Sequence, residues 1–295
     1  MAYATDSAVL FIVFNRPETT AQVFEAIRQA KPPRLYVAAD GPRKGEIREE
    51  ELIAKVREIA TRIDWPCELN TLYHEKNLGA QYGPKMAIDW FFENEEQGII
   101  LEDDCLPSSS FFGFCDILLI KYKENKNIKT ISGYNHFPVH GSSSYYFCKQ
   151  PGIWGWASWK DRWEEYVSNP IISNSSLLDL PSSLMQDYWR SIFVGFVEDR
   201  TYWDYQLTCL IMRSRGFSIR PLENLVQNIG HGVGATHTKL KNAKVSNNFA
   251  RDIDLEVLDS IDLEASVDED LLHYMNRFDG GVWAMIRRKL HAFFS

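Results

Sequence analysis

The first 130 residues alternate between two hydrophobic patterns. Runs of consecutive apolar residues, such as AVLFIVF at residues 8–14, are typical of strands that are covered on both faces of a parallel sheet. Between these runs, apolar residues recur every three or four positions, which is the period of an amphipathic helix. Strands are predicted at residues 8–14, 35–39, 69–73, 98–101 and 129–132, and helices from Pro17, over residues 52–63, 84–93 and 110–123. This order predicts an α/β fold with an open, mostly parallel sheet that is flanked by helices.

The alternation ends at residue 132. Residues 133–250 are rich in aromatic residues and short loops, and we interpret them as a second half that wraps onto the same sheet. Residues 251–270 contain nine acidic residues and one basic residue, which predicts a solvated connector within a C-terminal part at 251–295. Residues 279–295 carry an apolar helical stripe beside basic residues. This stripe either meets an anionic membrane surface or packs on the protein itself.

Composition excludes several classes of protein. The net charge of −8 argues against broad nucleic-acid binding, which needs a positive field to neutralise phosphates. The five cysteines are odd in number and form no CxxC pair, so neither a disulfide framework nor a zinc site is indicated. Because the first residues lack a signal-peptide pattern and no apolar run is long enough to cross a bilayer, we expect a cytoplasmic protein.

Three consecutive carboxylates, Glu102-Asp103-Asp104, follow the apolar strand at 98–101. Like charges repel one another strongly at short range in a region of low dielectric, so such a cluster is stable when a divalent cation lies against it. Oxygen ligands suit Mn²⁺ or Mg²⁺, and Mg²⁺ typically binds substrate phosphates together with one or two protein carboxylates. The alternative is a solvated acidic turn. The position directly after a buried strand favours a metal site, because ligands of open α/β sheets bind beyond the carboxyl ends of the strands.

The segment with this acidic run and the following Phe111-Phe112 resembles the variant DxD motif of GT-A glycosyltransferases. It is most similar to the inverting N-acetylglucosaminyltransferases that start complex N-glycans, and to their bacterial relatives. The resemblance covers residues 8–240 in motif order. It implies that Asp104 binds the metal, that Asp103 lies near the ribose and phosphates, and that Glu102 faces the transferred sugar.

Other nucleotide-side residues follow from the same resemblance. Arg16, after the first strand, corresponds to an arginine that contacts the nucleotide, although a surface arginine beside a helix start is an equal alternative. Asp40, after the second strand, corresponds to an aspartate that accepts from the uracil N3–H, and the competing interpretation is an Asp-Gly turn. Asn77, Gly79 and Lys85 resemble the loop and helix start that approach the diphosphate, where glycine permits close backbone approach and lysine supplies charge.

The segment Pro151-Gly-Ile-Trp-Gly-Trp-Ala-Ser-Trp159 resembles the acceptor loop of these enzymes. Trp154 and Trp156 are candidates for stacking on a sugar face, with Gly155 admitting the backbone closely. The alternative is that these tryptophans anchor the two halves of the protein together.

The segment Tyr202-Trp203-Asp204-Tyr205 resembles a Trp-Asp segment of the family, and the aspartate of that family segment is the catalytic base. Trp203 is therefore a candidate acceptor contact and Asp204 the candidate base, while a helix N-cap is the alternative for Asp204. His231 lies in a glycine-rich stretch that suits a mobile loop, and we consider it a second metal ligand.

Together these residues predict a metal-dependent, inverting glycosyltransferase. It would move a sugar from a nucleotide-diphosphate donor, with a UDP-sugar favoured, to a hydroxyl of a glycan or glycolipid acceptor in surface polysaccharide or glycan synthesis. A sugar-nucleotide nucleotidyltransferase is the first alternative, but such enzymes usually have a glycine-rich basic loop where this chain has Asn15-Arg16-Pro17-Glu18. A non-catalytic carbohydrate-binding protein has no evident need for the acidic run. A phosphohydrolase with Asp103 as nucleophile lacks a matching lysine or threonine motif.

Overall fold

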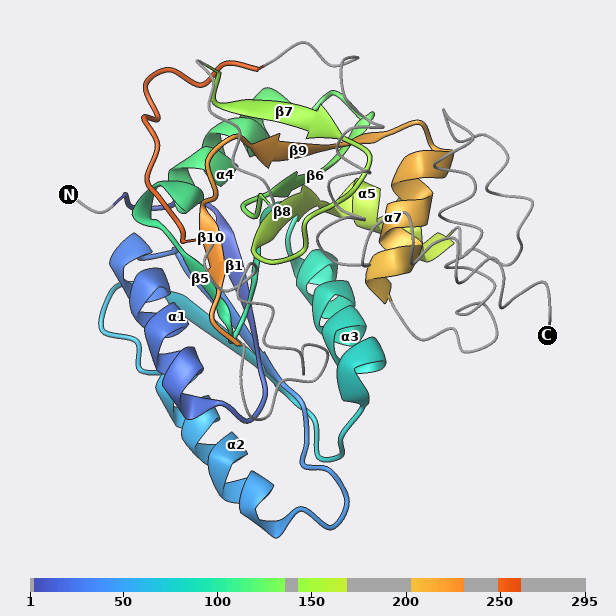
Figure 1. Ribbon diagram of the computed structural model, residues 1–295. Coiled ribbons are helices and arrows are strands. Elements are labelled where there is room, and N and C mark those ends of the chain that lie inside the picture. The colour runs from blue at the N-terminus through green and yellow to red at the C-terminus, as the bar shows by residue number, and fades with distance from the viewer. Residues whose placement is uncertain (1–2, 136–142, 169–202, 231–248, 261–295) are drawn as a thin grey trace, which may run out of the picture.

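The computed structural model describes residues 3–135, 143–168, 203–230 and 249–260 (Figure 1). In this part of the chain the central sheet has eight strands in the order β3-β2-β1-β4-β8-β6-β9-β7. The strands are β1 (Ala8–Val13), β2 (Arg34–Ala39), β3 (Glu68–Tyr73), β4 (Gln97–Glu102), β6 (Ile128–Ser132), β7 (Tyr145–Cys148), β8 (Trp156–Trp159) and β9 (Phe217–Pro221). Strands β7 and β8 run antiparallel to their neighbours and the other six share one direction. The mostly parallel α/β sheet predicted from the sequence is confirmed.

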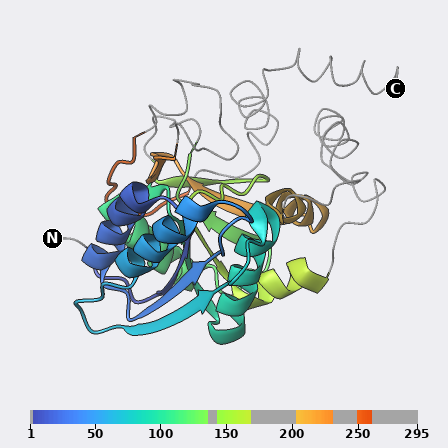
Figure 2. The same ribbon diagram turned by 90° about the horizontal axis from the view of Figure 1, so that it is seen from below.

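Helices cover both faces of the sheet. They are α1 (Pro17–Ala30), α2 (Ile47–Ala60), α3 (Gly79–Asn94), α4 (Ser109–Lys121), α5 (Lys160–Ser168) and α7 (Trp203–Arg213). Side chains of α1, α2 and α4 pack into one hydrophobic core, and side chains of α3, α5 and α7 pack into a second core on the opposite face. Figures 1 and 2 show this layering, with α1 and α2 on one side of the β1–β2 pair and α3 on the other. None of the described helices is long and apolar enough to cross a membrane.

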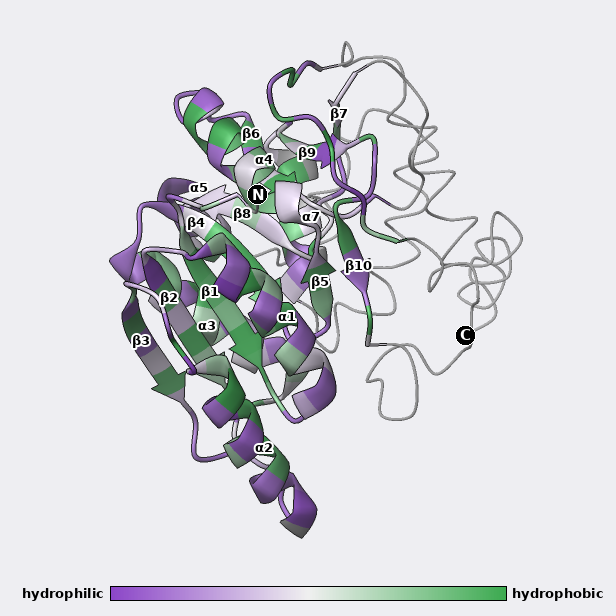
Figure 3. Cartoon of the chain, turned by 90° about the vertical axis from the view of Figure 1, so that its left-hand side faces the viewer, coloured by the Kyte–Doolittle hydropathy of each residue, from purple (hydrophilic) through white to green (hydrophobic). Residues whose placement is uncertain are grey.

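The alternation of side chains along each strand explains why the early strands read as continuous apolar runs. Successive residues of a strand point to opposite faces, so Phe11 of β1 enters the first core and Leu10 enters the second. Both side chains are fully buried. Figure 3 shows the result, with β1 hydrophobic along its length and α2 striped with hydrophobic and polar positions. On α2 the buried stripe includes Ile53, whereas the neighbouring Leu52 is 39% exposed.

Helix α3 begins earlier than the sequence predicts. It starts at Gly79 rather than near Pro84, which lies inside the helix. Proline is usually found in the first turn of a helix, because further inside it removes a helical hydrogen bond. For that reason the sequence predicts a helix start near Pro84. The additional first turn is stabilised from outside the helix, because the carboxylate of Asp40 accepts the backbone N–H of Gly79 (2.9 Å).

The second half of the chain adds strands to the same sheet. Strand β8 lies between β4 and β6 and pairs with both, so the sheet continues across residue 132 without a break. A second, two-stranded sheet joins β5 (Cys105–Pro107) to β10 (Val226–Asn228) in antiparallel fashion. This pairing brings the segment after the acidic run next to a segment about 120 residues later in the chain.

The start of the acidic connector has a structural role that the sequence did not predict. Asp252 accepts the backbone N–H of Ser110 (2.8 Å) and the hydroxyl of Ser109 (2.9 Å), so it binds the N-terminal turn of α4. Residues 252–255 therefore contact α4, and residues 257–260 pair with residues 144–145 at the start of β7, so this segment is not a purely solvated linker. The apolar stripe at 279–295 lies outside the described residues.

Candidate functional site

The candidate site lies at the carboxyl ends of β1 and β4. These neighbouring strands are parallel, with Ile12 opposite Glu102, so the residues that follow them meet at one edge of the sheet. The backbone N–H of Phe14 donates to Asp103 Oδ2 (3.0 Å), which joins the two strand ends directly. Arg16 and Asp104, which are 88 residues apart in sequence, meet here as well.

Arg16 forms an ion pair with Asp104. Its Nη1 donates to Asp104 Oδ2 and lies 3.7 Å from Asp103 Oδ1. Burial acts to lower the pKa of the Arg16 guanidinium, but the charges of Asp103 and Asp104 outweigh it and raise this pKa. Side-chain exposure is 27% for Arg16 and 15% for Asp104, so the pair is largely shielded from water. The sequence placed both residues at the site but predicted different partners for them.

Asp104 is enclosed by residues 228–230, none of which the sequence predicts as a site residue. The backbone oxygen of Asp104 accepts from Ile229 N–H (2.8 Å), and Asn228 Nδ2 lies 3.5 Å from Asp104 Oδ1. A Cβ on Gly230 would lie 2.1 Å from Asp104 Oδ2 and 2.7 Å from Arg16 Nη1, so the backbone of Gly230 packs directly on the ion pair. The sequence does contain a signal for this segment, because the polar and glycine residues of Asn228-Ile229-Gly230 follow a short apolar stretch. It could not show that the segment contacts Asp104, because only the β5–β10 pairing brings the two together.

The acidic run divides between the two faces of the sheet. Glu102 lies two residues after Ile100, so it points to the face that α3 and α7 cover, whereas Asp103 points to the α1 side. Burial, together with the charges of Asp104 and Asp103, raises the pKa of Glu102 to about 8. Burial also raises the pKa of Asp103 to about 7, against the opposing effect of Arg16. Without a further cation these two carboxyl groups are thus poorly stabilised as anions.

The described residues include no set of three or more His, Cys, Asp or Glu side chains that could hold a metal ion. A site of the Mg²⁺ or Mn²⁺ type needs only one or two protein carboxylates when phosphates and water supply the remaining ligands. Asp104, with Asp103 beside it, offers such a donor set. His231, the other predicted ligand, lies outside the described residues.

Asp204 lies in the first turn of α7, which packs on the face of the sheet toward which Glu102 points. Its charge is among the causes that raise the pKa of Glu102, so the two carboxylates are within electrostatic range of each other. Burial, and then the charges of Asp89 and Asp204, also raise the pKa of the Tyr166 hydroxyl. Asp204 therefore belongs to a partly enclosed, aromatic environment on the α7 side of the sheet.

Asp40 is occupied by the start of α3. Its carboxylate accepts from the backbone N–H groups of Gly41 (2.8 Å), Leu78 (2.8 Å) and Gly79 (2.9 Å) and from Asn77 Nδ2 (3.0 Å). A carboxylate has about four acceptor positions, and these four donors fill them. The structure thus places Asp40 together with Asn77 and Gly79 at the start of α3, a contact that the sequence did not predict. These hydrogen bonds give Asp40 a structural role, and its contact with a base stays a prediction.

Lys85 also has an internal partner. Its Nζ donates to Asp89 Oδ2 (2.6 Å), one turn further along α3. Asp89 Oδ1 accepts from the indole N–H of Trp163 on α5 (2.8 Å). Lys85 is therefore linked through Asp89 to the packing of α3 on α5, and the diphosphate contact predicted for it stays a prediction.

The tryptophans predicted to contact the acceptor divide into two groups. Trp156 of β8 and Trp203 of α7 are only 1% and 6% exposed, and their rings stack at 6.1 Å between centroids. Both belong to the second hydrophobic core, which supports the anchoring alternative for Trp156. Trp154 is half-buried, with its ring 4.5 Å from that of Tyr134. Gly155 adopts a φ of +69°, and a Cβ there would lie 2.7 Å from Val226.

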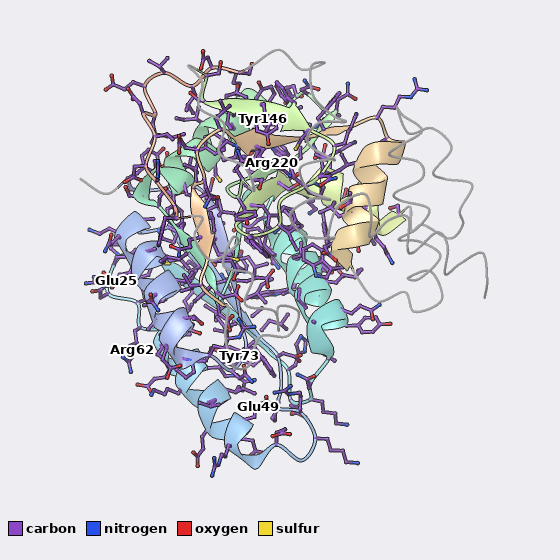
Figure 4. The ribbon with its side chains drawn as sticks, in the orientation of Figure 1. Glu25, Glu49, Arg62, Tyr73, Tyr146 and Arg220 are labelled. Carbon is purple, nitrogen blue, oxygen red and sulfur yellow. The ribbon has the colours of Figure 1, made fainter. Side chains whose placement is uncertain are left out.

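The loop after β1 is held in place from α2. Buried Glu49, labelled in Figure 4, accepts from Asn15 Nδ2 (2.7 Å) and from Arg43 Nη2 (2.6 Å). Burial acts to raise the pKa of Glu49, but the hydrogen bonds from Arg43 and Asn15 outweigh it and lower this pKa. This network positions the chain directly before Arg16, so the site arginine has a supported backbone.

No protein-family model matches the sequence, and no curated protein matches it. Two solved structures of UDP-glucose pyrophosphorylase are similar to 73% of this chain and 90% of theirs: an apo form (TM-score 0.38, 10% identity) and a complex with UDP-glucose (TM-score 0.38, 9% identity). The glycosyltransferase GlyE of Streptococcus pneumoniae TIGR4 is similar over 72% of this chain and 45% of its own, with a TM-score of 0.33 and 11% identity. Likeness at this level is too low to assign an activity.

Proposed function

We propose that this protein is a metal-dependent glycosyltransferase that moves a sugar from a nucleotide-diphosphate donor to a hydroxyl of a glycan or glycolipid. The observation that carries the proposal is the group at the end of β4, where Glu102, Asp103 and Asp104 lie together with Arg16 against Asp103 and Asp104, and where Asp204 lies within electrostatic range of Glu102. Such a group combines a hard-cation donor set, a guanidinium suited to phosphate and a separate carboxylate. The role in surface polysaccharide or glycan synthesis, on the cytoplasmic side, is part of the same proposal.

Mn²⁺ or Mg²⁺ would be held by Asp104, with Asp103 as its neighbour. When bound, such an ion neutralises charge on the leaving diphosphate as a Lewis acid. The chain's own contribution is to bury two carboxylates whose pKa values are raised, so that cation binding relieves their mutual repulsion. Arg16 lies beside them and supplies a planar pair of donors for a diphosphate.

Asp204 is the proposed general base. An acceptor hydroxyl is a poor nucleophile at pH 7, and a carboxylate that takes its proton assists direct displacement at the anomeric carbon. The proposed mechanism inverts configuration because Asp204 acts on the acceptor from the α7 side, while the diphosphate lies by Arg16 and Asp104. Glu102, between the two, is proposed to face the transferred sugar.

The test is a transfer assay with a panel of nucleotide sugars, of which we expect a UDP-sugar to be used, in Mn²⁺ and in excess chelator. We expect turnover only with the metal, and loss of both turnover and metal-dependent donor binding in Asp104→Asn. Asp64→Asn is the matched control, because Asp64 is exposed and paired with Arg28 on a distant surface. Full activity of Asp104→Asn, or of the wild type in chelator, contradicts the proposal.

A further inference from the structure

Arg16 already binds the carboxylate of Asp104, the residue that is proposed to bind the metal ion. Its Nη1 donates to Asp104 Oδ2, which is the same carboxylate oxygen that Gly230 packs against. The same nitrogen lies 3.7 Å from Asp103 Oδ1, so one guanidinium serves both aspartates. A positive charge is therefore already present where a divalent cation would have to enter.

The surrounding backbone leaves little room for both cations. A single additional carbon on Gly230 would lie 2.1 Å from Asp104 Oδ2 and 2.7 Å from Arg16 Nη1. The hydrogen bond from Ile229 N–H to the Asp104 backbone oxygen (2.8 Å) holds this segment in place. A metal ion that approaches Asp104 Oδ2 must therefore displace the guanidinium rather than bind beside it.

Arg16 is also a residue with a second possible partner. It is 27% exposed and lies at the ligand edge of the sheet, and guanidinium groups bind phosphate oxygens in a bidentate manner. A diphosphate at this edge would compete with Asp104 for the guanidinium. A metal ion at Asp104 and a diphosphate at Arg16 would each break the Arg16–Asp104 ion pair. Binding of either one therefore favours binding of the other.

We propose that Arg16 acts as an internal counter-ion that keeps free metal away from Asp104 until a nucleotide diphosphate takes the guanidinium. This inference rests on the proposed function and adds a binding order to it: the metal and the diphosphate bind tightly only together. Because coupling between two ligands is reciprocal, the nucleotide raises metal affinity by the same factor as the metal raises nucleotide affinity. Arg16 is in this sense a positioning residue for the donor complex.

The experiment measures Mn²⁺ binding to the full chain without nucleotide, by electron paramagnetic resonance of free Mn²⁺. Arg16→Gln removes the competing charge, so it should bind Mn²⁺ at least about tenfold more tightly than the wild type. It should bind UDP more weakly in the presence of Mn²⁺, so that the coupling between the two ligands falls. Arg28→Gln is the matched control, since Arg28 pairs with exposed Asp64 and should leave both affinities unchanged.

Two further variants keep the test decisive. Adding Asp104→Asn to Arg16→Gln should abolish the tightened Mn²⁺ binding, which locates the effect at this carboxylate. If Arg16→Gln fails to fold by circular dichroism, Arg16→Lys tests the same point, because it keeps a charge but loses the planar fork and should tighten Mn²⁺ binding to a smaller extent.

The possible failures are distinguishable. Unchanged or weaker Mn²⁺ binding by folded Arg16→Gln, in a protein whose wild type binds Mn²⁺ with UDP, overturns the counter-ion role and leaves the proposed function standing. A wild type that binds neither UDP nor Mn²⁺, alone or together, overturns the proposed function and this inference with it.

Discussion

Replacing Asp40 with alanine should destabilise the protein rather than change its choice of nucleotide. The carboxylate accepts four hydrogen bonds, three of them from backbone N–H groups at Gly41, Leu78 and Gly79. Asp40→Ala leaves these donors without their partner and removes an anion from the N-terminus of α3. Water replaces part of the loss because the contacts are only partly buried.

The expected cost follows from those contacts. Loss of an N-terminal helix cap typically costs ~1 kcal/mol, and hydrogen bonds to a charged group contribute ~1.5–3 kcal/mol each before solvent compensates. We expect Asp40→Ala to lower the free energy of unfolding by about 3 kcal/mol. For a chain of 295 residues this corresponds to a fall of roughly 5 °C in Tm. Asp40→Asn keeps one acceptor oxygen and should lose about half as much.

The assay is urea unfolding followed by circular dichroism, with UDP affinity measured by calorimetry at a temperature where all variants are folded. Asp64→Ala serves as the control, since an exposed ion pair with Arg28 should contribute less than about 1 kcal/mol. The reasoning is refuted if Asp40→Ala unfolds at the wild-type urea concentration while its affinity for UDP falls. That result would restore Asp40 as a base-contacting residue.

Three further predictions concern the base, a buried lysine and a packed glycine. Asp204→Asn should fold and bind donor normally but lose ~10²–10⁴-fold in transfer rate, and near-wild-type turnover or a product of retained configuration would rule out the base assignment. Burial lowers the pKa of Lys149 from 10.5 to about 8, because the folded protein disfavours the charged ammonium. The contribution of Lys149 to stability is therefore complete only above pH 10.5, where the amine is neutral, and it is lost as pH falls through about 8. Relative to Lys149→Met, the unfolding free energy of the wild type should therefore rise by up to ~3 kcal/mol as pH is raised from about 8 to 10.5. Parallel plots of unfolding free energy against pH for the two proteins would contradict this prediction. Gly98→Ala places a Cβ 2.3 Å from Phe91 Cζ and should cost ~1–3 kcal/mol, partly recovered by Phe91→Leu, whereas strictly additive costs in a double-mutant cycle would argue against this packing.

The sequence by itself determined the order and type of the first-half elements that build the central sheet, although not the residues at which α2 and α3 begin. Apolar runs predict strands that are buried on both faces, and β1 and β4 are such strands. The same local signal placed Glu102, Asp103 and Asp104 at the ligand edge, because a polar run directly after a buried strand has to lie at the strand's end. These conclusions need only short-range periodicity and the rule that parallel strands share one carboxyl edge. The sequence could not locate the short strands β7, β8 and β9, whose four or five residues carry too little periodicity.

Only the tertiary structure decided which partner each polar or aromatic side chain has. Asp40 meets the α3 start 38 residues away, and Arg16 meets Asp104 at a separation of 88 residues. Trp156 became a core residue because β8 is inserted in the middle of the sheet, where both faces are covered. In each case the sequence shows that a residue lies near a strand end, but the groups that satisfy its charge, hydrogen bonds or apolar surface come from distant segments. The energy of a buried polar group depends on those groups, and they are brought together only when the chain folds.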